Sequence, residues 1–489
     1  ACTHGFESRT DHHLKTNRFY KRLLFYGGNM KKYFGDKSFY KKVILIALPI
    51  MLQQGITQFV SLLDNVMIGN FSDTAMAGVS VVNQIIFVFN FVIIGALAAV
   101  GIYIAQYFGA NDQHNQMLCF RLKFWVGLII LLLMILIILV FGDYLINAFL
   151  TNPSSQEEKL AIETSAKDYL FIISFTFLPY TISQIYSSTL REVGETVKPM
   201  IAGAIAVVVN GIFNMWFIYG GLGLPAMGAS GAAIATLIAR IVEMLFLIFF
   251  THKHHKKFNF VEGVFKSVYV PKRIIKNVLI KGTPLIFNEL LWSLGTTLLL
   301  RIYSNRGTDI LKAFSISSTT TNLFYIIFGA MASAISIMVG QSLGAGNLEE
   351  AVDNDRKLIM FSVIVCFIFG IILACIAPII PMLYKDTSQD VRKLATSLMF
   401  VIAGCMIIFS FNTSCFYTLR AGGVTFVTFL FDSLFVWVVS LPLALVLVKL
   451  TDASIVLVYF IVQITEIIKS VIGYLLIKSK IWVKNLVVE

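Results

Sequence analysis

The sequence contains little charge for its length. Only 13% of its 489 residues are charged, whereas 57% are hydrophobic, and the mean hydropathy is +0.80. So few polar groups cannot cover the outside of a water-soluble protein of this size, but lipid accepts apolar side chains on every outward helix face. The composition therefore excludes an ordinary soluble protein and predicts a membrane protein.

Cysteine and histidine are also sparse. The six cysteines include no CxxC pair and lie mostly within apolar runs, which indicates neither a disulfide framework nor a metal site. Several of the seven histidines precede Met30, and His252, His254 and His255 lie in a basic segment that we interpret as a solvated loop rather than a zinc site. We therefore expect neither an enzyme nor a bound cofactor.

Residues 1–29 are polar and precede Met30, which is followed by what reads as an ordinary bacterial amino terminus. They contain no apolar stretch and no small-residue cleavage site, so we predict no signal peptide. We expect a disordered extension outside the fold.

The net charge of +12 does not indicate a nucleic-acid partner, because the basic residues are spread between apolar runs rather than gathered in one patch. They predict topology instead, since loops rich in Lys and Arg stay in the cytoplasm. Residues 31–42 carry five lysines and the connection at residues 251–276 carries seven basic residues, whereas residues 69–78 and 221–228 carry none. We expect a monomer in a bacterial inner membrane with both termini in the cytoplasm.

Apolar stretches of about 20 residues, enough to cross a hydrocarbon core of about 30 Å, recur about twelve times. We therefore predict an all-α integral membrane protein with two pseudo-symmetric six-helix lobes, at residues 30–250 and 277–489, joined by the basic connection at residues 251–276. The expected spans are Val43–Ile68, Val79–Tyr107, Phe124–Leu150, Tyr169–Leu190, Pro199–Gly220, Ala229–Phe250, Asn277–Ile302, Ala313–Gly340, Leu358–Leu383, Leu394–Leu419, Thr425–Leu450 and Ala453–Ile477.

The two lobes carry related motifs. Residues 105–112, after the second span, match residues 340–347, after the eighth, and residues 189–194 match residues 418–423. Each copy follows an even-numbered span, so we infer parallel repeats related by an axis along the membrane normal. Rocking of two such bundles exposes a central cavity to each side in turn, which favours a transporter.

Four polar residues are expected at one depth in the outer half of the first lobe. Asp64 lies about five residues from the end of the first span, Asn210 and Asn214 lie one turn apart on the fifth, and Thr236 lies on the sixth. A carboxylate with amide and hydroxyl oxygens can hold a small cation, and the carboxylate can equally bind a proton. The alternative is a buried Asp bonded to Asn only to lock helices together. The second lobe has apolar residues at the positions of Asp64 and Asn210, namely Leu299 and Val439.

Glu289 lies about twelve residues into the seventh span, near the middle of the membrane. Pro284 removes a backbone donor and tends to bend the helix, which opens carbonyl groups beside the acid. With Asn288 and Trp292 beside it, Glu289 could receive a proton or face a cationic, partly aromatic substrate. The alternative is a buried carboxyl group bonded across helices for structural reasons.

The remaining charges within the spans have structural interpretations. Arg240 with Glu243, and Glu466 with Lys469, have the i, i+3 spacing of pairs on one helix face. Asp432 lies near an end of the eleventh span, where it can reach the membrane interface. The many Phe and Met residues could line an adaptable cavity, but such side chains more often face lipid or neighbouring helices.

A further set of motifs runs through the chain in a fixed order: Pro49, Gln58, residues 64–69, Gln106 with Gly109, residues 231–236, Asn288 with Glu289, Gln341 with Gly344, and residues 419–423. From about Met30 to the carboxyl end, this order resembles the multidrug and toxic compound extrusion (MATE) family. The resemblance implies secondary antiport, in which uptake of Na⁺ or H⁺ drives export of small organic, often cationic and amphipathic compounds. It also implies that Asp64 binds the ion or proton beside Asn210, and that Glu289 serves coupling or substrate binding.

Two departures from the family pattern leave the coupling ion open, because Asn214 and Val424 stand where many members carry Asp. The nearest alternative is a lipid-linked oligosaccharide flippase of the same superfamily. Its diphosphate cargo would need a cationic cavity, whereas the groups singled out here are acidic or neutral. A channel or receptor is disfavoured by the two-lobe repeat.

Overall fold

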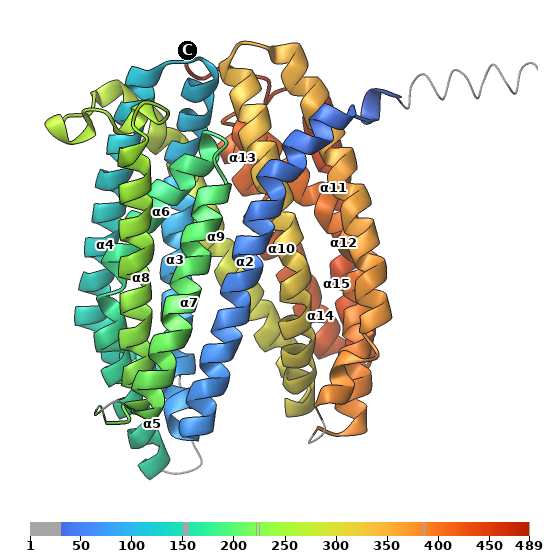
Figure 1. Ribbon diagram of the computed structural model, residues 1–489. Coiled ribbons are helices and arrows are strands. Elements are labelled where there is room, and N and C mark those ends of the chain that lie inside the picture. Colours follow the sequence, from blue (N-terminus) through green and yellow to red (C-terminus); the bar gives the residue numbers. More distant parts are fainter. Residues whose placement is uncertain (1–30, 150–155, 222, 224, 385–386, 489) are drawn as a thin grey trace, which may run out of the picture.

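The protein is a bundle of long helices, as seen in the computed structural model, which describes residues 31–149, 156–221, 223, 225–384 and 387–488 (Figure 1). Within these residues, eleven helices are long and apolar enough to cross a membrane, and a bent pair brings the number to twelve. The predicted fold class, an all-α membrane protein, is confirmed. The extension at residues 1–29 lies outside the described residues.

The first half of the chain contains the bent pair in place of the predicted fourth span. Helices α5 and α6 meet at an angle of 47°. Pro179 lies in the first turn of α6, where its missing N–H is tolerated, so the chain restarts a helix there instead of continuing α5. The elements of this half are η1 (Lys31–Tyr33), α2 (Lys37–Phe71), α3 (Asp73–Gly109), α4 (Gln113–Phe149), α5 (Gln156–Ser174), α6 (Phe177–Glu192), α7 (Val197–Tyr219) and α8 (Gly228–Lys253).

The second half follows a connection with two short helical turns, η2 (Asn259–Val261) and η3 (Val264–Lys266). Its eleventh predicted span is divided by two stretches of π-helix, η5 and η6. The elements are α9 (Lys272–Ser304), α10 (Thr308–Gly344), α11 (Leu348–Ile376), η4 (Ile380–Leu383), α12 (Gln389–Ala421), α13 (Thr425–Phe429), η5 (Leu430–Leu434), η6 (Val436–Ser440), α14 (Leu441–Leu450), α15 (Ile455–Ile464) and α16 (Glu466–Lys478).

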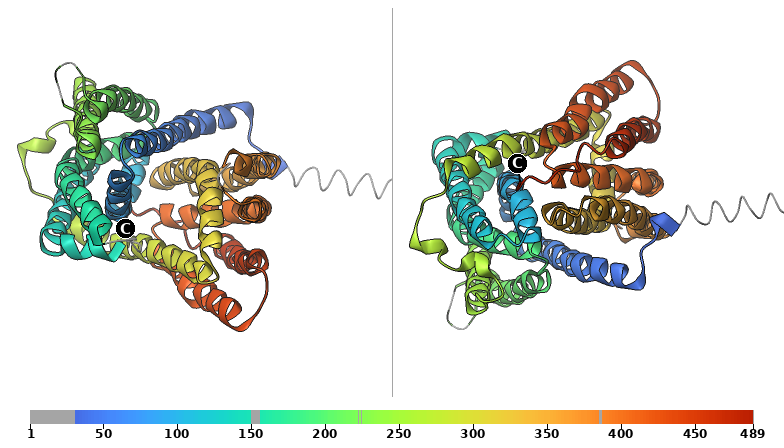
Figure 2. Two further views of the ribbon diagram at one scale, coloured as in Figure 1. Left: turned by 90° about the horizontal axis from the view of Figure 1, so that it is seen from below. Right: turned by 90° about the horizontal axis from the view of Figure 1, so that it is seen from above.

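The beginning and the end of the described chain lie at the same end of the bundle as residues 254–271 (Figure 1). We call this the connection end, and the opposite end the far end. Viewed along the bundle, the helices of the first half gather on one side and those of the second half on the other (Figure 2). We call the contact surface between the two halves the seam. A movement of one half against the other would change the contacts at the seam.

Two large apolar cores stabilise the halves, and helix α2 contributes to both. Ile68, near its far end, belongs to the core of the first half, whereas Val43, Ile46 and Ile50 are buried in the core of the second. Met331 and Met338 are also buried in that second core, so they pack between helices rather than line a cavity. Helix α2 thus crosses the seam.

Candidate functional site

The four polar residues predicted in the first half form one chain of hydrogen bonds. Asn214 on α7 donates from Nδ2 to Asp64 Oδ1 at 2.5 Å and to Asn210 Oδ1 at 3.1 Å. Asn210 donates in turn to Thr236 Oγ1 on α8 at 3.2 Å. Because Asn210 and Asn214 are buried, this cluster joins α2, α7 and α8 in the interior of the half.

One oxygen of this cluster has no partner. Within the part of the chain that the structure describes, Asn214 Oδ1 is shielded from solvent and accepts no hydrogen bond. Leaving such a group unsatisfied costs roughly 1–3 kcal/mol. A bound cation would remove that cost, and carboxylate, amide and hydroxyl oxygens are suitable ligands for a small hard cation. The residues present therefore fit an ion as well as a proton.

The Arg240 guanidinium interacts electrostatically with Asp64. Arg240 Nη1 lies 2.7 Å from Glu243 Oε2, which confirms the pair predicted from the i, i+3 spacing. The histidines of the connection do not form a metal site: in the described ranges, no three His, Cys, Asp or Glu side chains cluster as metal ligands.

Glu289 lies on the seam between the halves. A Cβ added to Gly95 on α3 would lie only 2.8 Å from Glu289 Cγ, so glycine is needed there. One turn along both helices, Trp292 stacks on Phe91 with ring centroids 6.1 Å apart. Arg420 Nη1 approaches Glu289 Oε1 to 3.7 Å. Two of the predicted side chains therefore face the opposite half, where a movement of the halves changes their surroundings.

Asn288 bonds within the second half. Ser433 Oγ donates to Asn288 Oδ1 at 2.6 Å, and Asn288 Nδ2 donates to Asp432 Oδ2 at 3.3 Å. Both partners lie in the π-helical stretch η5, and such local widening of a helix is frequent at functional sites. The structure thus brings Asn288 to η5, while its neighbours Glu289 and Trp292 contact α3.

Asp432 does not simply reach the membrane interface, contrary to the expectation from its position. It pairs with Lys469 on α16 at 2.8 Å, and Lys469 also pairs with Glu466 at 3.2 Å, as predicted. Asn412 Nδ2 on α12 donates to Glu466 Oε2 at 2.8 Å. The i, i+3 spacing relates residues on one helix. It therefore predicts the Glu466–Lys469 pair but not the pairing of Asp432 with a residue on another helix. The available signal was a third charge, without an obvious partner, in the adjacent span.

The repeated motifs meet where the halves close at the connection end. Gln106 Nε2 donates to the carbonyl of Ala421 in the second half at 2.9 Å, and Gln341 Nε2 donates to the carbonyl of Glu192 in the first half at 2.9 Å. Gln106 corresponds to Gln341 in the two repeats, and Glu192 to Ala421. The two halves therefore exchange the same hydrogen bond, which sequence comparison did not reveal.

Two glycines allow this closure. A Cβ at Gly109 would lie 2.0 Å from the carbonyl oxygen of Gln341, and a Cβ at Gly344 would lie 1.9 Å from that of Gln106. A side chain at either position would push the halves apart. Helices α3 and α10 therefore cross in direct backbone contact.

The last residues of the chain pass through the same closure. The Leu486 amide donates to Gln106 Oε1 at 2.8 Å, and Asn485 Nδ2 donates to the carbonyl of Gly344 at 3.2 Å. Trp482 is buried in the core of the second half, whereas Leu486 packs with side chains of α3, α4 and α9. This terminal segment, residues 480–488, links the two halves.

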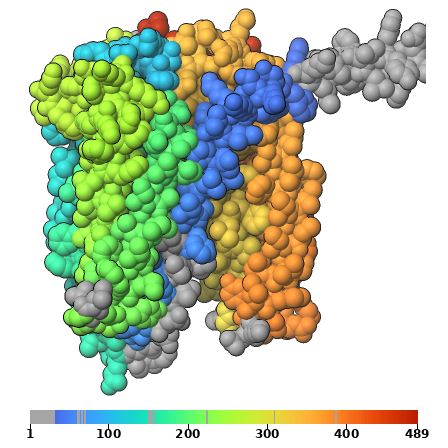
Figure 3. All heavy atoms as spheres, in the orientation of Figure 1, coloured from blue at the N-terminus to red at the C-terminus, as the bar shows by residue number. Residues whose placement is uncertain are grey.

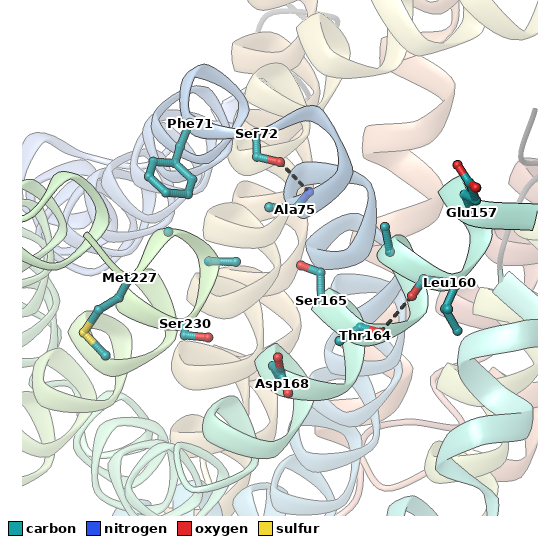
Figure 4. Close-up of a pocket in the computed structure, with 13 residues that line it drawn as sticks. Phe71, Ser72, Ala75, Glu157, Leu160, Thr164, Ser165, Asp168, Met227 and Ser230 are labelled. Atoms are coloured by element: carbon teal, nitrogen blue, oxygen red, sulfur yellow. Dashed lines mark hydrogen bonds between the residues drawn. The ribbon is translucent and has the colours of Figure 1, made fainter. Parts of the chain in front are cut away.

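A separate pocket of about 560 Å³ opens at the far end, between the end of α2, the start of α3, α5 and the start of α8 (Figure 4). Glu157, Asp168 and several hydroxyl groups line it. It shares no residue with the Asp64 cluster or with the residues around Glu289, so it does not extend either of them.

The MatE family model matches residues 49–216 and 284–450, which together make up more than half of the chain. The chain belongs to this family of multidrug-efflux (MATE) transporters. It is 27% identical over 415 residues to the probable multidrug resistance protein NorM of Thermotoga maritima, covering 84% of this chain and 86% of the relative. It is 23% identical over 422 residues to the probable multidrug resistance protein YoeA of Bacillus subtilis, covering 86% and 89%.

Solved MATE structures share the fold. A MATE protein crystallised in the bent conformation superposes with a TM-score of 0.80 at 18% identity, covering 92% of this chain and 96% of the other. A multidrug resistance MATE transporter in its outward-facing conformation superposes with a TM-score of 0.81 at 18% identity, covering 92% and 97%. The family resemblance inferred from the motif order is confirmed, and the chain is a multi-span membrane transporter rather than an enzyme.

Proposed function

We propose that the chain exports small organic, often cationic and amphipathic compounds by secondary antiport in exchange for Na⁺ or H⁺. The ion binds at Asp64 with Asn210, Asn214 and Thr236, and the cargo is sensed at Glu289 and Trp292. The observation that supports this most directly is the Asp64 cluster, in which a carboxylate is joined to a buried amide whose oxygen has no partner among the described residues.

The charges around Glu289 favour a cationic cargo. Among the described residues, three carboxyl groups in this region form ion pairs with two basic side chains, which leaves an excess of negative charge in these pairs when all are ionised. Trp292 and Phe91 add aromatic faces, and a cation over such a face gains about 0.5–2 kcal/mol. A flippase for a diphosphate cargo would need the opposite excess of charge. The groups involved are Glu289, Asp432 and Glu466 with Arg420 and Lys469.

The contact surface between the two halves supports alternating access, because the halves can rock against each other there. We infer that residues 30–250 and 277–489 rock as two lobes, with the connection at residues 251–276 between them. The exchanged glutamine bonds hold the connection end closed, while Figure 3 shows a recess between the halves at the far end. In this arrangement the cargo site opens toward the far end.

The basic residues support the orientation of the chain. Residues 31–42 carry five lysines and the connection carries seven Lys and Arg, and positive loops remain in the cytoplasm. We therefore place the connection end and both termini in the cytoplasm of a bacterial cell. The far end then faces outward, as export requires.

Efflux of a cationic dye from proteoliposomes tests the proposal, with Na⁺ and H⁺ gradients imposed separately. We expect one of the two gradients to drive efflux. Asp64→Asn removes the charge while keeping the shape, and because coupling between two ligands is typically about 5–150-fold, gradient-driven efflux should fall about tenfold or more.

The matched control is Asp309→Asn, which removes a carboxylate whose side chain is 69% exposed at the start of α10. Efflux in this variant should equal that of the unchanged protein. If neither gradient drives efflux, the antiport proposal fails, and if Asp64→Asn behaves like Asp309→Asn, Asp64 has no part in coupling.

A further inference from the structure

The connection between α8 and α9 is held rigidly by α4. The Arg121 guanidinium donates to three backbone carbonyls of the connection: to Val264 at 2.9 Å, Tyr269 at 2.7 Å and Gly263 at 3.1 Å. Trp125 Nε1 adds a bond to the carbonyl of Val268 at 3.0 Å. Because these carbonyls are satisfied from inside, the backbone is fixed, with the Val264 side chain buried and several of its neighbours exposed.

Three of these exposed side chains are large and apolar. Phe265, Val268 and Tyr269 are 67%, 73% and 65% exposed. Both end-on views show the connection projecting sideways beyond the helices (Figure 2). Aromatic side chains at the edge of a membrane protein are typical of the level of the lipid headgroups. The projection is therefore placed to touch the membrane surface.

Beside this projection, one face of α8 borders an open, shallow recess of about 810 Å³ whose described lining residues all lie on α8. Leu245, Ile248 and Phe249 form its apolar wall, which ends in the polar pair His252 and Lys253. His252 is itself fixed, since it bonds to Tyr186 Oη at 3.0 Å and stacks on Phe265 with ring centroids 6.0 Å apart. An apolar wall that ends in basic groups matches a lipid tail below its headgroup.

The connection between α8 and α9 carries far more positive than negative charge. Residues 251–276 contain seven Lys and Arg but a single acid, Glu262. Lys257 is engaged with Glu195 at 2.7 Å. Lys253 lines the recess and Lys266 follows Phe265 in the sequence, and both lysines are exposed. An excess of positive charge beside an apolar wall attracts an anionic headgroup rather than a zwitterionic one.

We propose that this recess binds an anionic phospholipid, with its phosphate near His252, Lys253 and Lys266 and an acyl chain along Leu245 and Phe249. The site lies on the outer surface of the first half, away from the seam, and its existence does not depend on the transport mechanism proposed above. Its occupant belongs to the leaflet on the connection side.

Native mass spectrometry of the full-length protein with added phosphatidylglycerol tests the proposal, with phosphatidylcholine of the same chains as the reference. We expect phosphatidylglycerol to be retained preferentially. The double variant Lys253→Ala/Lys266→Ala should retain about thirtyfold less of it, because each lysine near an anionic headgroup contributes about 1 kcal/mol. Lys253→Arg/Lys266→Arg should restore retention.

The control variant Lys41→Ala/Lys42→Ala removes the same charge from exposed positions on α2 at the same end of the molecule. It should keep the retention of the unchanged protein. Equal retention of the two lipids, an equal loss in the control, or no loss in Lys253→Ala/Lys266→Ala overturns the site. Because lipid retention is measured without cargo or ion gradient, failure of the antiport proposal leaves this result interpretable.

Discussion

Among single residues, Thr236 offers the mildest change that still probes the Asp64 cluster. Its hydroxyl accepts the hydrogen bond from Asn210, which in turn fixes Asn214 beside Asp64. Thr236→Val keeps the shape and removes that acceptor. A hydrogen bond contributes roughly 0.5–1.5 kcal/mol, so the ion concentration that gives half-maximal efflux should rise about threefold to tenfold. The measurement is dye efflux from proteoliposomes at graded ion concentrations.

The matched control is Thr320→Val, since Thr320 is buried in the second half and, among the described residues, its hydroxyl donates only to the carbonyl of Ile316 on its own helix, at 3.2 Å. Its half-maximal ion concentration should not change. Equal shifts in the two variants would mean that Thr236 acts through general packing and not through the ion.

These residues could be predicted because a helix converts sequence position into depth. Asp64, Asn210 and Thr236 were expected at one level from the rise per residue alone, and the hydrogen-bond chain agrees with that geometry. The pairing of Asp432 with Lys469 could not be derived from spacing within one helix, since it depends on how two helices are rotated toward each other. The depth of a residue follows from its position along one helix, whereas the rotation of that helix depends on the helices packed against it.

At the scale of elements, hydropathy located the spans but not their ends. Helix α2 begins at Lys37, six positions before the predicted start, because Asp36 caps it by accepting from the Phe39 amide at 2.8 Å. Polar first turns of this kind extend beyond the apolar run. The bend between α5 and α6 was missed for a related reason, since apolarity continues through it while the helix does not.

The terminal segment is an element whose contribution can be tested. Ending the chain after Lys484 removes the Asn485 and Leu486 bonds to α10 and α3, yet keeps Trp482 in the core. Losing two hydrogen bonds of about 1 kcal/mol each should shift the equilibrium at the connection end about tenfold or more toward opening. Spin labels at His114→Cys and Glu349→Cys, with the native cysteines replaced, report the distance across the seam.

A chain ended after Leu486 serves as the control, because it keeps both bonds and loses only residues 487–489. Its distance distribution should match that of the full chain. If the two shortened chains give the same distribution, the terminal segment does not stabilise the closed connection end.

On the scale of the whole molecule, the two halves share their repeated motifs but differ in the polar side chains within their helices. Equivalent glutamines and glycines of the two repeats make reciprocal contacts, so both halves contribute equally to the closure. The Asp64 cluster occurs in the first half, and Leu299 takes the corresponding place in the second. With the ion site that we propose at Asp64, a symmetric closure would let one ion act on both halves, because a movement of the first half must break bonds to the second.

This dependence can be tested by locking the closure. A Cβ built at Gly340 would lie 3.2 Å from Ala105 Cβ across the seam, and a disulfide spans about 3.5–4.5 Å between Cβ atoms, so Ala105→Cys/Gly340→Cys should form one after slight adjustment. With the native cysteines replaced, oxidation should stop dye efflux and a reducing agent should restore it, because rocking has to separate these two positions.

Gly473→Cys provides a matched crosslink within one half, since its Cβ would lie 3.2 Å from that of the native Cys415, with α16 and α12 both in the second half. This disulfide does not cross the seam, so oxidation should leave efflux nearly unchanged. Efflux that persists after complete crosslinking of Ala105→Cys/Gly340→Cys would show that transport does not require the halves to part at the connection end. Efflux that stops only with the crosslink across the seam ties transport to the contact at which the two repeats meet.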